Sequence, residues 1–288
     1  MTAYPPVIIM GMHRSGTTMI SRMLDDLGIY MGKIGDQNHE ALFFHRINQW
    51  LLSQSGGSWS YPEAIDSLLD QAEARAHVAA YLRFLVDSPR SALYLGLGGY
   101  WQSRGLTTRT APWGWKNPVN TYTLPLWLDV FPDAKVIYIY RHGIDVAQSL
   151  VKRTNQHLRH NLTRWQHFPG NLRYSLVYGT WPKYSTRCLN LTGAFTLWEA
   201  YSQRGDQNMA ALPAGQGLSI RYEDFLQNPV SGLQNICDFT AIQPGTARIE
   251  AVAAQVDVSR SQAYEGNPEL QAFYEQVKDS VQMQRYGY

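Results

Sequence analysis

Three short segments of the chain carry residues whose types and spacing could do chemistry. The first, residues 11–18, reads GMHRSGTT and follows the apolar run VIIM. A glycine-rich loop between a strand and a helix presents backbone N–H groups to an anion, and nearby hydroxyls and cations add further donors. The residues expected to bind that anion are His13, Arg14, Ser15, Gly16, Thr17 and Thr18.

The spacing of Gly11 and Gly16 is that of a phosphate-binding Walker A loop, G-x-x-x-x-G-K-[ST], but Thr17 stands where that motif has lysine. The missing lysine would span the β- and γ-phosphates of a nucleoside triphosphate. A donor that carries another group on a single 5′-phosphate does not need that reach. A phosphotransferase of the P-loop kinase kind remains the alternative enzyme.

A second segment, KVIYIYRHGIDVAQSL, places Arg141 directly after an apolar strand and Ser149 eight residues later on the following helix. A Walker B strand would end in an aspartate that helps to hold Mg²⁺. Here a cation stands instead, and a cation with a hydroxyl suits a second phosphate that takes no part in the chemistry.

These segments, with the lysine of WGWKNP, resemble the sulfotransferases that use 3′-phosphoadenosine 5′-phosphosulfate (PAPS), most closely the carbohydrate and tyrosylprotein branch. The resemblance covers most of the chain in order and spacing. It implies that the first loop binds the 5′-phosphosulfate, and that Arg141 and Ser149 bind the 3′-phosphate. It also implies a hydroxyl acceptor, 3′-phosphoadenosine 5′-phosphate (PAP) as product and no required metal. A nucleotide-binding module without turnover is the non-enzyme alternative.

The catalytic residues follow from the same resemblance. Glu40 stands where the family has its general base, and His39 is the immediate rival because its ordinary pKa also suits proton transfer. His45 is a weaker candidate. Lys116, in a lysine–asparagine–proline setting, is expected to contact the bridging oxygen of the donor, with Arg14 sharing the charge stabilisation. Arg260 lies where late residues close over the nucleotide, and the choice between Glu40 and His39 stays open.

Strands alternate with helices along the chain, which predicts an α/β fold of three layers, with helices on both faces of a central parallel sheet, as in P-loop NTPases. We expect one domain, residues 1–288, with a basic and aromatic acceptor-side insertion around 154–192. The expected strands are 7–10, 113–116, 135–140 and 218–222. The expected helices are 17–27, 40–52, 66–87, 119–131, 144–153 and 194–209, with 96–105 rich in loop, 154–192 irregular and 230–286 mostly helical.

The bulk composition limits the partners. A net charge of +2 gives no strong signal for nucleic acid or a membrane. No apolar run is long enough to span a bilayer, and the first strand begins too early for a signal peptide, so a cytoplasmic location is expected. The basic and aromatic insertion could bind a glycan or another acidic acceptor, and a carbohydrate or glycosylated metabolite is the favoured acceptor. The sequence leaves the oligomeric state open.

Overall fold

The computed structural model describes residues 3–165, 185–257 and 264–288. Its contacts divide the chain into two units, the first formed by Met1–Arg141 with Tyr201–Ser261 and the second by His142–Ala200 with Gln262–Tyr288. The first unit holds the sheet and nearly all of the candidate site.

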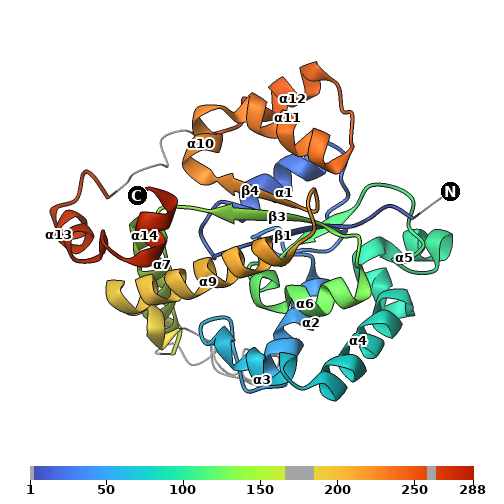
Figure 1. Ribbon diagram of the computed structural model, residues 1–288, viewed down its shortest axis with the longest axis horizontal. Coiled ribbons are helices and arrows are strands. Elements are labelled where there is room, and N and C mark those ends of the chain that lie inside the picture. Colours follow the sequence, from blue (N-terminus) through green and yellow to red (C-terminus); the bar gives the residue numbers. More distant parts are fainter. Residues whose placement is uncertain (1–2, 166–184, 258–263) are drawn as a thin grey trace. The chain divides into compact units, whose positions relative to one another are not determined.

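A four-stranded parallel sheet in the order β2–β1–β3–β4 forms the centre of the first unit (Figure 1). Its strands are β1 (Val7–Gly11), β2 (Gly114–Lys116), β3 (Lys135–Tyr140) and β4 (Gly217–Arg221). The side chains of β1 are buried along its whole length, as expected for a strand of a parallel sheet covered on both faces. The predicted fold class is confirmed.

Helices cover both faces of this sheet in the first unit (Figure 1). On one face lie α1 (Thr17–Asp26), α10 (Tyr222–Gln227), α11 (Pro229–Thr240) and α12 (Thr246–Ala253). On the other lie α2 (Leu42–Ser53), α3 (Asp66–Leu69), α4 (Ala72–Asp87), α5 (Ala92–Ser103) and α6 (Asn120–Val130), with the 3₁₀ turns η1 (Pro62–Ile65) and η2 (Pro89–Ser91).

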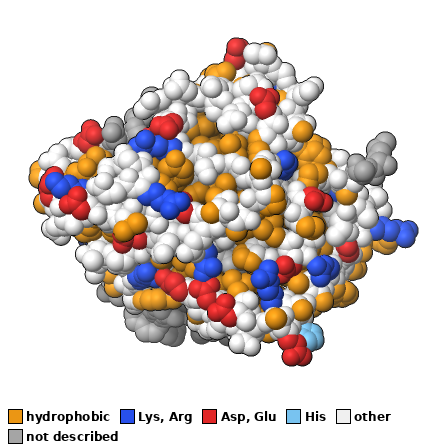
Figure 2. Space-filling view, viewed as in Figure 1, with side chains coloured by type: hydrophobic (Ala, Val, Ile, Leu, Met, Phe, Trp, Pro, Cys, Tyr) orange, Lys and Arg blue, Asp and Glu red, His pale blue; other side chains and the backbone are white. Residues whose placement is uncertain are grey.

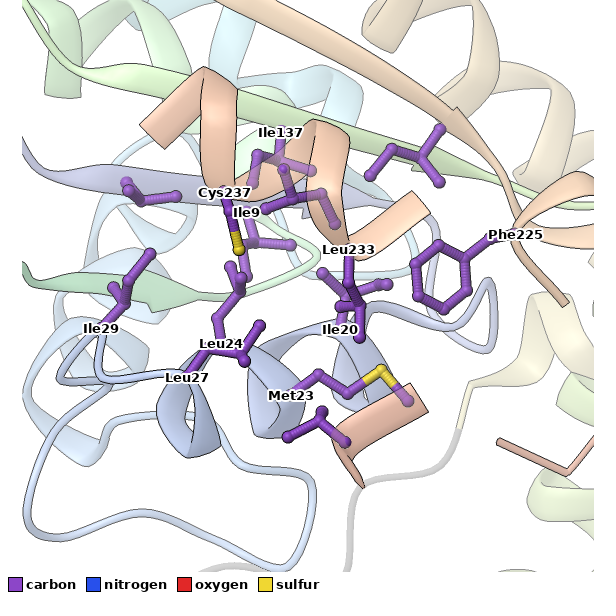
Figure 3. Close-up of a cluster of buried hydrophobic side chains, with 14 of the residues drawn as sticks. Ile9, Ile20, Met23, Leu24, Leu27, Ile29, Ile137, Phe225, Leu233 and Cys237 are labelled. Carbon is purple, nitrogen blue, oxygen red and sulfur yellow. The ribbon is translucent and has the colours of Figure 1, made fainter. Parts of the chain in front are cut away.

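The apolar face of α1 forms the core on its side of the sheet (Figure 3). Ile20, Met23 and Leu24 recur at helical spacing and belong to one buried cluster with Ile9 of β1 and Ile137 of β3, which Leu233 and Cys237 of α11 complete. This packing fixes the direction of α1, and therefore the place where its N-terminus meets the glycine-rich loop.

A buried polar network fixes α2 on the opposite face. Asn48 of α2 donates from Nδ2 to Oδ1 of Asn120, 2.8 Å away, and accepts from Thr123 and from the Trp127 indole. Asn120 in turn donates to the carbonyl of Ile9 in β1. Buried amides of this kind are stable only when their partners are in place, so the network holds α2 in one position relative to the sheet.

The second unit contains α7 (Gly143–Trp165), η3 (Thr186–Cys188), α13 (Pro268–Val277), α14 (Val281–Tyr286) and the first part of α9 (Leu191–Ala211). Its core is aromatic. The ring of His142 stacks on Tyr264 at 4.4 Å between centroids, and Trp198 lies against Gly143, where a Cβ would be 2.8 Å from its ring. Trp198 is completely buried and therefore packs in this core.

Three expected segments are wrong. Residues 96–105 were predicted to be rich in loop, but 92–103 form α5, which bends at Gly96 (φ 75°, ψ 162°) and continues. Tyr94, which is buried and donates to the carbonyl of Gly114, anchors this helix despite its glycines. Such tertiary anchoring outweighs the low helix propensity of glycine.

The helix expected over residues 66–87 is divided into α3 and α4 by the extended backbone of Gln71 (φ −96°, ψ 95°). Arg75 on α4 donates two hydrogen bonds to Asp129 of α6, at 2.7 and 2.9 Å, which gives α4 its own direction. The irregular segment predicted from residue 154 is helical as far as Trp165, because no glycine or proline interrupts α7 there.

Side chains of both charges are interspersed over the face drawn in Figure 2, in keeping with the small net charge. No helix among the described residues is long and apolar enough to cross a membrane.

Candidate functional site

The carboxyl ends of the four parallel strands meet at one edge of the sheet, and each candidate segment of the first unit follows one of them. The register pairs Ile9 with Lys116, Gly11 with Ile139 and Tyr140 with Arg221. The glycine-rich loop, Lys116 and Arg141 therefore lie along the same edge, which is where open α/β sheets bind their ligands.

The loop after β1 requires glycine at two positions, because a Cβ at either one would clash with a neighbouring residue. Gly11 has φ 139°, and a Cβ there would come within 2.2 Å of the carbonyl oxygen of Ile139. Gly16 has φ 96°, and a Cβ there would be 2.3 Å from the ring of Tyr222. Arg14 also has a positive φ, 72°. This backbone turns directly into α1, whose first turn has no acidic residue to neutralise its N-terminus, so the loop suits an anion.

Arg141 lies beside this loop. Its guanidinium is 4.6 Å from the centre of the Tyr222 ring, and its Nη1 donates to the carbonyl of Arg14 at 3.4 Å. Tyr222 therefore lies between the loop and the end of β3, in contact with Gly16 on one side and Arg141 on the other. The predicted cation Arg141 thus contacts the backbone of the loop at Arg14.

Glu40 and Lys116 form an ion pair although 75 residues separate them in the chain. The Lys116 Nζ is 3.0 Å from Oε1 of Glu40, and both side chains are almost completely buried. Glu40 Oε2 accepts from Nδ2 of Asn117, at 2.9 Å, and from Nδ1 of His45, also at 2.9 Å. The structure thus brings together two of the predicted catalytic residues, with three donors on one carboxylate.

The electrostatics of this group follow from its burial and its partners. Burial by itself raises the pKa of the Glu40 carboxyl, but the hydrogen bond from His45 and the charges of Lys116 and His13 outweigh it and hold the pKa at about 2. Burial lowers the pKa of Lys116, and the attraction of Glu40 opposes that shift. With both partners ionised, Glu40 is a weak base in this state.

His45 orients Glu40 from the side of α2. Because a carboxylate only accepts, Nδ1 of His45 carries the proton in their hydrogen bond. Its Nε2 is 2.8 Å from Nε2 of Gln49, one turn further along α2, so a second contact holds the ring from its other side. Sequence reasoning treated His45 only as a weak rival base and gave Asn117 no part. The His–x₃–Gln spacing, which places both side chains on one helix stripe, was the available signal.

His39 points to α1. Its Nδ1 is 2.9 Å from the hydroxyl of Ser21 and its Nε2 is 3.5 Å from Asp25. The hydroxyl of Thr18 donates to the carbonyl of Asn38 at 3.0 Å, so both contacts attach the segment before Glu40 to α1. In this arrangement His39 holds the segment, and Glu40 faces Lys116.

The remaining predicted site residues are distributed as follows. Ser15 and Thr17 are buried in the loop, and the ring of His13 lies 4.8 Å from that of Trp59 and 6.2 Å from that of Tyr201. Ser149 lies on α7 in the second unit and is half-buried. Arg260 lies outside the described residues, as do residues 166–184 of the expected insertion. Within the described parts of the chain, no cluster of three metal-ligating side chains occurs.

Comparison with known proteins gives a clear family match. A model described as "Sulfotransferase family" matches residues 5–243, which include the loop, Glu40, Lys116, Arg141 and Ser149. No curated protein sequence matches the chain.

One of the similar solved structures shows the same fold. The sulfotransferase domain of the olefin synthase of Synechococcus PCC 7002 is 18% identical, with a TM-score of 0.52 over 100% of this chain and 96% of that one. A sulfotransferase of Alicyclobacillus acidocaldarius is 16% identical, with a TM-score of 0.48 over 99% of this chain and 96% of that one. At 18% identity the likeness to the olefin synthase domain concerns the fold alone.

Proposed function

The chain belongs to the sulfotransferase family, and from this premise we propose that it transfers a sulfuryl group from PAPS to a hydroxyl group. The observation that carries the proposal is the buried Glu40–Lys116 pair at the same sheet edge as the glycine-rich loop. That pair combines a base for the acceptor with a cation for the leaving group, beside a loop suited to an anion.

The loop residues and Arg14 would bind the phosphosulfate, and Arg141 with Ser149 would bind the 3′-phosphate. The unneutralised N-terminus of α1 and the guanidinium of Arg141, which donates to the backbone carbonyl of Arg14, fit a ligand with several negative charges. PAPS is the donor in this proposal, PAP is the product, and no metal is required.

The chemical step is an in-line displacement at sulfur. The acceptor oxygen forms a bond to sulfur while the bond from sulfur to the bridging phosphate oxygen breaks, and its electron pair stays on PAP. Glu40 takes the hydroxyl proton, and Lys116 stabilises the charge that develops on the bridging oxygen. Atoms and charge balance without a further reactant.

The ion pair gives Lys116 two alternative partners. With its Nζ 3.0 Å from Glu40, the carboxylate is held at a pKa of about 2. A bound phosphosulfate would compete for the same cation. Movement of the Lys116 ammonium towards the donor would weaken the attraction that lowers the pKa of Glu40. Donor binding would thus raise the basicity of Glu40, while His45 and Asn117 keep the carboxylate in place.

The acceptor we propose is a carbohydrate or a glycosylated metabolite. Support comes from the composition of residues 146–198, which contain no acidic residue after Val146 and before Glu199 and are rich in basic and aromatic side chains. Aromatic faces with nearby cations suit sugars that carry acidic groups. A screen of hydroxyl compounds with radiolabelled PAPS tests this part separately from donor binding.

Calorimetric titration with PAP, and with ATP plus Mg²⁺ in parallel, tests the donor site. We expect PAP to bind without metal and ATP to bind weakly. Arg141→Ala should weaken PAP binding by roughly 1.5–3 kcal/mol, the value of a charge-assisted hydrogen bond, whereas the exposed Arg104→Ala serves as control. Tight, Mg²⁺-dependent ATP binding without a PAP response would favour the kinase alternative. PAP binding without any modified acceptor would favour the non-catalytic module.

A further inference from the structure

A cavity lies in the first unit, on a different side of α2 from Glu40. It has a volume of about 700 Å³, within the range of about 300–1,000 Å³ typical of small-molecule sites. Its floor is the stripe of α2 that carries Phe43, Arg46, Ile47 and Trp50. His45 and Gln49, which orient Glu40, occupy another stripe of the same helix, so this cavity is separate from the proposed site of sulfuryl transfer.

The walls are apolar. Ten of the twelve lining residues are aliphatic or aromatic, from α2, α4, α5, the turn η2 and Ile34. The rings of Trp50 and Tyr81 meet at 5.4 Å and form one wall. Side chains that would ordinarily be covered are exposed here, since Ile34 is 45% and Leu97 is 74% accessible. An open cavity with such walls favours an apolar ligand.

The charges at the cavity have one sign. Among the residues that the structure describes, its two charged lining side chains are Arg46 and Arg90, and no acidic side chain lines it. Arg90 donates from Nη1 to the hydroxyl of Tyr81 at 3.2 Å, which holds it beside the aromatic wall. A third cation, Lys33, lies against Gly96, next to Leu97. An apolar chamber bordered by cations is complementary to a molecule with an apolar chain and an acidic head.

We propose that this cavity binds an amphipathic anion, a single apolar chain of roughly fatty-acid size ending in a carboxylate or a similar acidic group. The chain lies between α2, α4 and α5, and the acidic group meets Arg46 and Arg90. The inference does not depend on the proposed sulfuryl transfer, because none of the residues that bind the ligand belongs to the Glu40–Lys116 group or to the glycine-rich loop.

The test is calorimetric titration of the full chain with decanoate below its aggregation concentration, and with decan-1-ol as the uncharged probe of equal length. We expect saturable decanoate binding with a dissociation constant on the order of 10–100 μM, and weaker binding of the alcohol. Arg46→Gln with Arg90→Gln should weaken decanoate binding about three- to tenfold, a small effect because both groups are exposed, and leave the alcohol unchanged.

Two variants test whether the probes bind inside the cavity. Ala92→Phe places a ring inside it and should abolish binding of both probes. Leu97→Asp adds a negative charge at a side chain that is already exposed, so the fold should tolerate it, and it should weaken decanoate binding more than alcohol binding. The matched control is Val281→Asp, an equally exposed apolar residue at the start of α14, which should change neither.

Absence of saturable binding of either probe to the wild type would overturn the proposal, as would an Ala92→Phe variant that binds like the wild type. A further titration uses vesicles of anionic phospholipid. It tests whether α5, which carries the exposed Leu97 and Trp101, docks on a membrane instead. Binding to vesicles without binding of monomeric decanoate, and unaffected by Ala92→Phe, would mean a membrane-docking surface and would also overturn the proposal.

Discussion

Replacing Lys116 with methionine removes the charge from a buried ion pair and keeps the length of the side chain. At 3.0 Å the gross attraction between Lys116 and Glu40 is about 5–6 kcal/mol at an effective dielectric constant of 20. Both groups lose solvation on folding, so the pair itself contributes much less than this. The variant, however, leaves Glu40 buried and charged with only Asn117 and His45 as partners. We expect a loss of about 3–5 kcal/mol in the free energy of unfolding.

A double-mutant cycle separates this pairing from packing. Glu40→Gln alone leaves Lys116 buried without a counter-charge and should also destabilise the protein. The double variant buries neither charge, so its loss should be smaller than the sum of the two single losses by about 2 kcal/mol or more. Urea unfolding followed by tryptophan fluorescence measures all four proteins, since the chain has nine tryptophans.

The matched control is the ion pair of Lys278 with Glu275, which has the same chemistry on an exposed helix surface. The cycle of Lys278→Met with Glu275→Gln should show no measurable coupling, because exposed pairs gain little in water. If the losses at Lys116 and Glu40 simply add in the double variant, the two groups do not pair in solution. The account of how the pKa of Glu40 is lowered would then be refuted.

Three further outcomes are expected. In a turnover assay, Glu40→Gln should lower kcat by roughly 100-fold or more, with PAP affinity unchanged or tighter. His39→Asn should leave kcat near that of the wild type. The reverse pattern would make His39 the base. The second outcome concerns the pH dependence of the free energy of unfolding. The stabilisation from ionised Glu40 is fully present above its unfolded pKa near 4.5 and is lost as the pH falls towards about 2. Over this range the wild type should therefore lose stability more steeply than Glu40→Gln. In urea unfolding, Gly11→Ala should cost about 2 kcal/mol or more, whereas Gly98→Ala, on an open helix surface, should stabilise by roughly 0.5–1 kcal/mol.

Local patterns in the sequence predict the sheet well. The alternation of strands and helices gives the parallel topology, and β3 begins and ends at the predicted residues because six branched, aromatic or long side chains lie between Ala134 and Arg141. The errors occur where distant contacts decide the local structure. The glycines of α5 favour a loop, but the hydrogen bond from Tyr94 to Gly114 anchors a helix there. The sequence of α3 and α4 predicts one helix, but the contact of Arg75 with Asp129 gives α4 its own direction.

The same limit applies to the site. The family resemblance predicts the roles of Glu40 and Lys116, but their direct contact depends on how α2 is fixed against the sheet by Asn48 and Asn120. No spacing in the chain encodes that network. The hydrogen bonds of His45 and Asn117 to Glu40 follow from it, whereas the His–x₃–Gln spacing indicates only that His45 and Gln49 share one stripe of the helix.

The contact between Gly16 and Tyr222 joins two positions that are more than 200 residues apart in the chain. The ring of Tyr222 fills the space that a Cβ at Gly16 would need, and it also supports Arg141. A larger residue at position 16 would therefore require a smaller one at position 222. Relatives that carry a side chain at the last glycine of the loop should have a small residue at the position that follows β4, and a homologue search that compares these two columns would show whether they change together.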